Sequence, residues 1–426
     1  MHYLYIHMST PLAYCEIKLS TIPNFHDVIK NDGILDNDNN SNSNILKLTK
    51  TECASKMYTV IQYDKHVLND DLISTYGLCR SIIVNEHDKM VCFSPPKSIP
   101  SDEFIKKYPN KTDAIVAQEF VEGTMINVFW DENIGLTGGW EISTRNTVGA
   151  TSGFYKSADS KTFRTMFLEA AQENNLCLNK LNPAYCFSFV LQHPENRIVV
   201  PFNKACIYLV AMYHIDDTEM NNIRVYSYNI DEMRKLNWMN ADIKFPQTYY
   251  GDNYTELINQ YASMNTAYDV LGFVLYNALT GERSKIRNPV YEQVRALRGN
   301  QPKLQYQYLT LRKQNKVKEF LKYYPENKRN FSEYREQLHL FTNTLFMNYM
   351  SCYIKKEQPL NQYSEQYRTH MFELHKLYIT SLRVNALVVT NRIVIDYVNN
   401  LQTTLLMYCL NFHMRKRSVD FIMANK

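Results

Sequence analysis

Two groups of residues in this sequence have types and spacings suited to holding phosphate. Lys285 and Arg287 are two residues apart in Ser-Lys-Ile-Arg-Asn, and side chains two apart along a strand point to the same face of a sheet. Both could therefore reach one phosphate group. The turn Glu122-Gly123-Thr124 separates two strand-like stretches, and its glycine permits a positive φ or a close approach of the backbone to a ligand. Each pattern also occurs in ordinary strands and hairpins.

Three further cations lie where a bound anion would explain them. Arg80 lies in the apolar segment 77–86, which we predict to be a strand, and burying an unpaired charge is costly. Lys97 follows two prolines that stiffen the chain, and Arg145 lies in a Ser-Thr-Arg-Asn turn. A structural ion pair is the alternative for Arg80, and an ordinary surface position is the alternative for Lys97.

In their order and spacing these segments resemble the adenylyltransferase domain of phage-type RNA ligases, the RNA ligase 1 family that seals broken tRNA. The resemblance runs from about residue 57 to residue 291 and is carried by segments 77–86, 95–97, 119–131, 140–149, 187–202, 269–277 and 284–291. It implies RNA as a partner, with tRNA as one candidate, a nucleotide as a further ligand, and ATP and Mg²⁺ as cofactors if the protein is active. The residues that it implies in nucleotide or phosphate binding are Arg80, Lys97, Glu122, Gly123, Arg145, Lys285 and Arg287.

Three positions depart from the pattern of these ligases. An RNA ligase uses a lysine amine to attack the α-phosphate of ATP, and the matching position in this sequence is Phe120, which has no lone pair. Two carboxylates of the family, which contact the nucleotide sugar or the metal, correspond to Val190 and Leu271. Hard cations need oxygen ligands, so both the covalent and the metal routes are closed at these positions. The sequence therefore indicates no catalytic residue and no metal ligand.

Three functions are compatible with this pattern. The first is a pseudoenzyme that binds RNA or a nucleotide without forming lysyl-AMP, for example in RNA repair by a large DNA virus. The second is an active nucleotidyltransferase that uses another amine, with Lys97, Lys111 and Lys285 as candidates. The third is a structural or virion protein that kept a ligase fold. A partner subunit that supplies the missing chemistry is also compatible with the sequence.

Positive charge is concentrated in the last third of the chain. Residues 301–426 contain 19 Lys and Arg against 9 Asp and Glu, which leaves 28 against 34 for residues 1–300. The C-terminal part is therefore a candidate surface for a polyanion such as RNA, although a basic helical surface is often simply solvated.

The hydrophobic pattern predicts an α+β domain of antiparallel strands followed by an all-α domain. Strands are expected at 57–63, 114–120, 125–130 and 205–214, with 205–214 in a central position, and an amphipathic helix at 161–174. Residues 1–56 should belong to the first domain and include a polar, mobile loop at 31–44. The ligase-like nucleotidyltransferase domain should cover 57–300, and the basic helical domain 301–426. An all-α ending is a further point of resemblance to phage-type RNA ligases.

Cysteine usage and hydropathy indicate the compartment. The nine cysteines show no Cys-x-x-Cys spacing, and no apolar run approaches 18 residues. We therefore expect reduced thiols and a soluble, intracellular protein without membrane partners, in the host cytoplasm or the virion if the source is viral. The sequence gives no oligomeric state.

Overall fold

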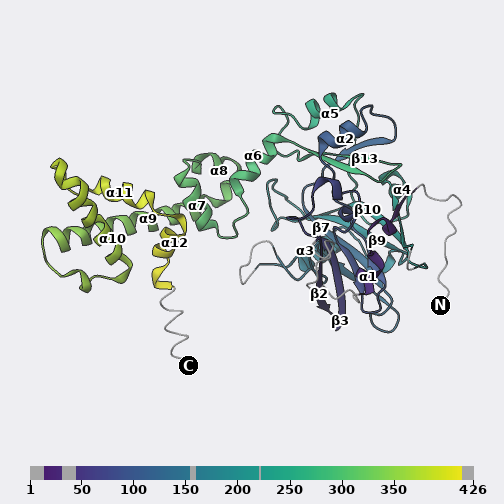
Figure 1. Cartoon of the computed structure of the whole chain (residues 1–426), viewed down its shortest axis with the longest axis horizontal. Coiled ribbons are helices and arrows are strands. Elements are labelled where there is room, and N and C mark those ends of the chain that lie inside the picture. Colours follow the sequence, from purple (N-terminus) through teal and green to yellow (C-terminus); the bar gives the residue numbers. More distant parts are fainter. Residues whose placement is uncertain (1–13, 31–44, 154–159, 220–221, 415–426) are drawn as a thin grey trace. The chain divides into compact units, whose positions relative to one another are not determined.

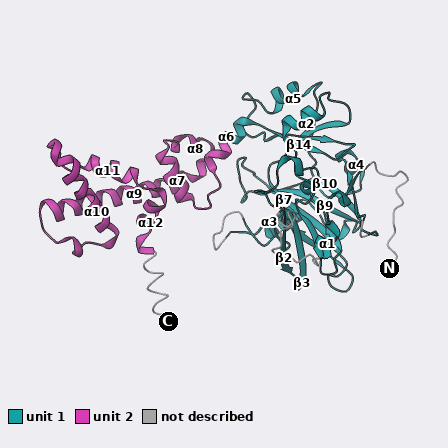
Figure 2. Cartoon of the chain, in the orientation of Figure 1, with its two compact units in different colours: residues 1–293 teal, residues 294–426 magenta. Residues whose placement is uncertain are grey.

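The computed structural model describes residues 14–30, 45–153, 160–219 and 222–414, and Figure 1 traces its elements in sequence order. The polar stretch 31–44, predicted to be a mobile loop, lies outside these residues. The chain divides into two compact units, residues 1–293 and 294–426 (Figure 2). The site residues named from the sequence all belong to the first unit.

Three antiparallel sheets form the framework of the first unit. The six-stranded sheet has the order β1-β11-β10-β9-β7-β8, with β1 (Tyr14–Lys18), β11 (Arg224–Tyr228), β10 (Cys206–Asp216), β9 (Tyr185–Gln192), β7 (Thr124–Asp131) and β8 (Gly139–Ser143). The second sheet has the order β12-β6-β13-β14, with β12 (Thr248–Tyr249), β6 (Ile115–Glu119), β13 (Gly272–Asn277) and β14 (Arg283–Arg287). The third has the order β2-β3-β4-β5, with β2 (Leu46–Cys53), β3 (Lys56–Tyr63), β4 (Ile82–Asn85) and β5 (Met90–Cys92). The predicted central strand is confirmed, because β10 lies between β9 and β11.

Helices cover the sheets of this unit. They are α1 (Phe25–Lys30), α2 (Ser101–Lys107), α3 (Phe163–Glu173), α4 (Ile230–Lys235) and α5 (Tyr254–Tyr261). Thr162 caps α3 by accepting the N–H of Thr165 at 3.1 Å, and the helix buries Met166 and Phe167 in the core of the six-stranded sheet. This confirms the predicted amphipathic helix. The second sheet shares a core with α2 and α5, in which Phe104 and Leu257 are fully buried.

One local prediction is wrong. The segment 77–86 is not one strand, because residues Tyr76–Leu78 form a 3₁₀ turn and β4 begins only at Ile82. The turn is held by hydrogen bonds to other segments: the carbonyl of Gly77 accepts the N–H of Lys97 at 2.9 Å. Arg80 therefore lies in a bend before the strand.

The second unit is helical, as predicted. Its helices are α7 (Leu304–Lys313), α8 (Val317–Tyr323), α9 (Lys328–Tyr349), α10 (Glu365–Leu377), α11 (Asn391–Asn400) and α12 (Thr403–Leu410), and α6 (Pro289–Arg298) spans the boundary between the units. Phe341, Leu345 and Tyr349, at three- and four-residue steps along α9, are buried on one face of the helix, whereas Cys352 is half-buried. The antiparallel α+β unit followed by a helical unit confirms the predicted fold class. Within the described ranges, no helix has the length and apolarity needed to cross a membrane.

Candidate functional site

Two glycines allow close approaches between strands near Phe120: Gly272, at the start of β13, lies against β14, and Gly123, just before β7, lies against β9. Gly272 has a φ of +121°, and a Cβ there would lie 2.1 Å from the carbonyl oxygen of Ile286 on the neighbouring strand. Gly123 has a φ of +148°, and its Cβ would lie 2.4 Å from the carbonyl oxygen of Leu191. L-residues rarely adopt such φ values, and no side chain fits these contacts. The close approach lets the N–H of Phe120, just after β6, donate to the carbonyl of Gly272 at 3.2 Å.

The side chain of Phe120 lies beneath two cations of β14. The Nζ of Lys285 is 4.9 Å from the centroid of the Phe120 ring, and the Cζ of Arg287 is 5.8 Å from the same centroid. Both distances are typical of cation–π contacts. The prediction that Lys285 and Arg287 share one face of a strand is therefore confirmed. The position that matches the ligase nucleophile carries an aromatic ring that faces these cations.

Arg80, Lys97 and Arg283 are near enough to act electrostatically on Lys285, and Arg145 acts in the same way on Arg80. Together with Lys285 and Arg287 we call these residues the cationic cluster. Its members are Arg80, Lys97, Arg145, Arg283, Lys285 and Arg287. Backbone hydrogen bonds gather them from distant segments. The N–H of Ile99, two residues after Lys97, donates to the carbonyl of Arg283 at 2.9 Å, and the N–H of Tyr63 donates to the carbonyl of Cys79, next to Arg80, at 2.7 Å.

The cluster is strongly electropositive, and its pKa values reflect this. Burial is the largest cause that lowers the pKa of Lys285 to about 6, and nearby positive charges add to it. Those charges belong to Arg283, Arg80, Arg287 and Lys97. Burial, followed by the charge of Arg283, also lowers the pKa of Arg80 to about 10, with a smaller effect from Arg145. Lys285 is therefore largely a neutral amine near pH 7.

Most of these cations have no acidic partner in the part of the chain that the structure describes. Arg287 pairs with Glu292 at 2.7 Å, but no described carboxylate forms an ion pair with Arg80, Lys97, Arg145, Arg283 or Lys285. The Nε atoms of Arg145 and Arg283 are buried and have no hydrogen-bond acceptor among the described residues. The guanidinium of Arg145 lies 5.0 Å from the centroid of the Tyr63 ring. Buried donors in proteins are normally satisfied. An arrangement of this kind is suited to an anion that supplies several acceptor oxygens.

The carboxylates beside Phe120 are already engaged. Glu122 accepts the backbone N–H groups of Val199 and Val200 at 2.8 and 3.2 Å and a hydrogen bond from the side chain of Tyr291. Glu119 accepts the N–H of Gln247 at 3.2 Å. Burial raises the pKa of both carboxyl groups. Glu122 thus supports the loop after β9, a structural contact that its sequence position did not indicate.

The positions of the two missing carboxylates are apolar and buried. Val190 is 6% exposed and Leu271 is 9% exposed, and the Cγ1 of Val190 would be 2.7 Å from a Cβ on Gly123. Among the described residues, no group of three or more His, Cys, Asp and Glu side chains is arranged to hold a metal ion. Since Mg²⁺ is held mainly by carboxylate, water and phosphate oxygens, the donor set of this site does not fit it.

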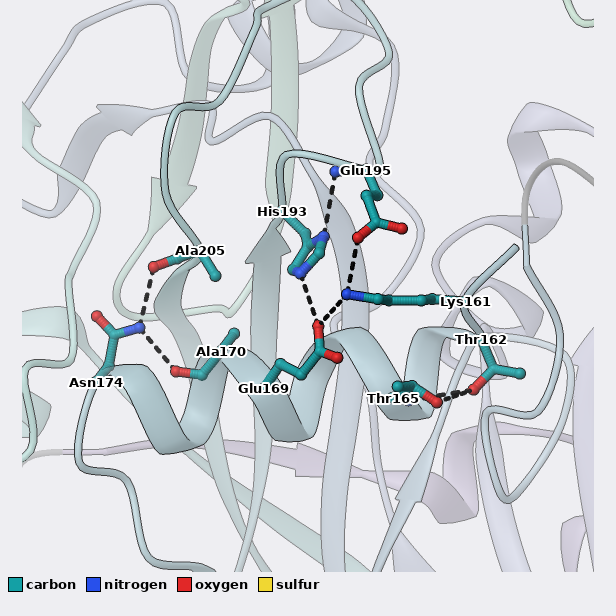
Figure 3. Close-up of polar contacts among 9 residues, drawn as sticks. All are labelled: Lys161, Thr162, Thr165, Glu169, Ala170, Asn174, His193, Glu195 and Ala205. Atoms are coloured by element: carbon teal, nitrogen blue, oxygen red, sulfur yellow. Dashed lines mark hydrogen bonds and ion pairs between the residues drawn. The ribbon is translucent and has the colours of Figure 1, made fainter. Parts of the chain in front are cut away.

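A separate polar network, which Figure 3 shows, differs from the cluster because its charges are paired. Lys161 contacts Glu169 at 2.9 Å and Glu195 at 2.7 Å, while the Nε2 of His193 lies 3.1 Å from the carboxylate of Glu169. The network anchors the 193–197 loop to α3, and the side-chain amide of Asn196 donates to Thr124 at 2.7 Å. The network thereby fixes the loop that leads to Val199 and Val200, whose backbone N–H groups donate to Glu122.

The structure brings five of the seven predicted binding residues into one cluster. The other two, Glu122 and Gly123, lie at the strand junction, and the binding role of all seven stays a prediction. Sequence reasoning missed Arg283, which precedes Lys285 by two residues and therefore lies on the same face of β14. That two-residue step, Arg-Ser-Lys-Ile-Arg, was the signal that could have found it. No described interaction links Lys111 to the cluster.

Comparisons with known proteins point to RNA ligases. The chain is 22% identical over 324 residues to an RNA ligase of Rhodothermus phage RM378, covering 69% of this chain and 71% of the phage protein. It is 24% identical over 278 residues to an immediate-early protein ICP-46 homolog of Invertebrate iridescent virus 6, covering 61% of this chain and 57% of that protein. The chain thus spans less than two thirds of the iridescent virus protein. No protein-family model matches the chain.

Solved structures similar to the chain are also RNA ligases, at low similarity. An archaeal ATP-dependent RNA ligase matches 69% of this chain and 76% of its own at 12% identity, with a TM-score of 0.38. An RNA ligase of Naegleria gruberi matches 58% and 76%, also at 12% identity, with a TM-score of 0.32. The sequence similarity to a phage RNA ligase confirms the general resemblance predicted above. The matches do not distinguish the tRNA-sealing subfamily.

Proposed function

We propose that the first unit binds the phosphate groups of RNA or of a nucleotide in the cationic cluster, as an RNA-ligase-like pseudoenzyme that forms no lysyl-AMP at position 120. The observation that carries the proposal is the cationic cluster beside Phe120, in which every member except Arg287 lacks an acidic partner among the described residues. Similarity to a phage RNA ligase supports RNA or a nucleotide as the ligand class. Because both curated relatives come from viruses, we place this binding in viral RNA handling, with RNA repair as the setting.

Phosphate oxygens supply what the cluster lacks. Arg guanidinium groups form charge-assisted, bidentate hydrogen bonds with phosphate. Within the described ranges, the buried Nε atoms of Arg145 and Arg283 are donors without acceptors. The cost of burying these charges is offset when an anion is bound. The net positive charge of residues 301–426 is available for a longer RNA backbone.

The test measures the binding of a 5′-phosphorylated RNA oligonucleotide to the full chain, with fluorescence anisotropy as the readout, at several salt concentrations. Phosphate contacts release counterions, so log affinity should fall linearly with log salt, by about 0.7 per contact for single strands. Arg283→Met should weaken binding about tenfold or more, because a charge-assisted hydrogen bond is lost. Lys47→Met, which removes an exposed lysine of β2, is the charge-matched control and should change little. Binding that is absent, or that does not depend on salt, would contradict the proposal.

A second candidate function follows from the position of Lys285. Its Nζ lies 4.9 Å from the centroid of the Phe120 ring and its pKa is lowered to about 6, so the amine is available as a nucleophile near pH 7. Attack on the α-phosphate of a nucleoside triphosphate would form an N–P bond, break the bond between the α-phosphorus and its bridging oxygen, and release pyrophosphate and the amine proton. Incubation with α-labelled ATP, denaturation and peptide mapping decide between the candidates. A label on Lys285 that Lys285→Arg abolishes supports this second function, and the absence of any label supports the first.

A further inference from the structure

The resemblance to RNA ligases implies a nucleotide that arrives with Mg²⁺, whereas the donor set of this site does not fit the metal. We propose that the cationic cluster binds a nucleoside polyphosphate without a divalent metal ion, and that Mg²⁺ weakens the binding. This inference rests on the proposed function, because it concerns the form of the ligand that the same site takes.

The site lacks the ligands that a metal ion would need. Mg²⁺ demands near-octahedral oxygen coordination and is usually held by one or two carboxylates together with phosphates. The two positions that match such carboxylates in RNA ligases hold Val190 and Leu271, which are buried hydrocarbon side chains. The neighbouring carboxylate of Glu122 already accepts two backbone N–H groups and a tyrosine hydroxyl. Freeing it would leave the N–H groups of Val199 and Val200 unsatisfied inside the protein.

The side chains of the cationic cluster carry the charge that a metal ion would otherwise supply. In metal-dependent sites the cation bridges phosphate oxygens and neutralises part of their charge. Here the charges of Arg283 and Arg145 act on Arg80, and those of Arg283 and Arg80 act on Lys285. None of these four side chains has an acidic partner within the described part of the chain. These side chains therefore provide the positive charge that a metal ion provides in metal-dependent sites. A divalent cation on the phosphates would be repelled by them and would also reduce the charge that they attract.

The ring of Phe120 offers no metal ligand. The ring of Phe120 lies under Lys285 and Arg287, and an aromatic face stabilises cations but offers no ligand to a hydrated metal ion. The ring packs against both cationic side chains without adding a negative charge to the cluster. The substitution that removes the nucleophile thus also favours a metal-free anion site.

The experiment measures the dissociation constant of ATP for the full chain in EDTA and in excess Mg²⁺, with ionic strength matched by KCl because salt alone screens the cluster. Binding in EDTA should be about tenfold or more tighter, since a tenfold change corresponds to one lost charge-assisted contact. A 5′-triphosphorylated RNA oligonucleotide forms the second arm and shows whether a free nucleotide or an RNA end is preferred. ATP binding that requires Mg²⁺, or that is equal in both buffers, would overturn the inference and leave the proposed function standing. No binding of either probe in either buffer would remove both.

A restoring variant gives an independent result. Leu271→Glu returns one oxygen ligand, and it should increase the affinity for ATP in Mg²⁺ relative to EDTA, whereas Leu271→Gln, which has similar size and no charge, should not. Should Leu271→Glu fail to fold, titration of the native protein with Mn²⁺ and ATP, followed by electron paramagnetic resonance of free Mn²⁺, answers the same question. The native protein should displace Mn²⁺ from ATP into solution, and uptake of Mn²⁺ into a protein complex would contradict the inference.

Discussion

Protonation of Lys285 should be coupled to phosphate binding. Its pKa is lowered from 10.5 to about 6 in the free protein, because it is buried among other cations. A bound phosphate stabilises the ammonium form and raises that pKa, so binding takes up a proton. Affinity should therefore be highest at and below about pH 6 and should fall as the pH rises toward the pKa of the bound form.

The size of the effect follows from the fraction of protonated amine. With a pKa of about 6, roughly half of the Lys285 side chains are charged at pH 6 and about 1% at pH 8. If only the ammonium form binds, the apparent affinity falls about 50-fold over this range, or about 2 kcal/mol.

The assay is isothermal titration calorimetry with ATP in EDTA at several pH values, in buffers of different ionisation enthalpy, which reports proton uptake directly. Lys285→Arg is the control, because arginine stays protonated over this pH range. Any pH dependence that remains in this variant comes from the ligand's own terminal phosphate, whose pKa is about 6. The affinity of this variant should not fall between pH 6 and pH 8. If the native protein and Lys285→Arg show the same pH profile, Lys285 is charged in the free protein and the reasoning is refuted.

Further substitutions test the geometry of the site. Gly272→Ala should lower the free energy of unfolding by about 3 kcal/mol or more, because the new Cβ would lie 2.1 Å from a backbone oxygen. The control is Gly135→Ala, which has open space around its Cβ and should lower the free energy of unfolding by about 1 kcal/mol. Thermal denaturation measures both effects. Arg283→Met should raise the free energy of unfolding by about 1–3 kcal/mol, because it removes a buried charge that has no acidic partner in the described residues. The same variant should weaken phosphate binding. The control Lys47→Met should change neither quantity. Glu122→Ala should lower the free energy of unfolding by about 2 kcal/mol in urea denaturation, because two buried N–H groups lose their acceptor. Equal effects of each variant and its control, or a stable Glu122→Ala protein, would contradict these assignments.

Much of the framework could be predicted because hydrophobic periodicity reports local structure. The strand 57–63 is β3, and the strands on either side of Glu122-Gly123-Thr124 are β6 and β7. The common face of Lys285 and Arg287 followed from the two-residue repeat of a strand. These features depend on neighbours in sequence, which a single sequence displays.

The features that could not be predicted depend on long-range contacts. The 3₁₀ turn before Arg80 is held by hydrogen bonds to Lys97 and Tyr63, which are distant in sequence. The engagement of Glu122 by Val199 and Val200 joins segments that are more than 70 residues apart. Whether a carboxylate is free for a ligand or satisfied by the backbone is decided by such contacts. No local pattern reports them.

The central claim is reversible phosphate binding without a covalent intermediate at position 120. The most direct test is retention of α-labelled ATP by the full chain before and after denaturation, in EDTA and in Mg²⁺. The account predicts label on the native protein, more in EDTA than in Mg²⁺, and complete loss of label on denaturation. Label that survives denaturation, or native protein that retains none, would contradict it.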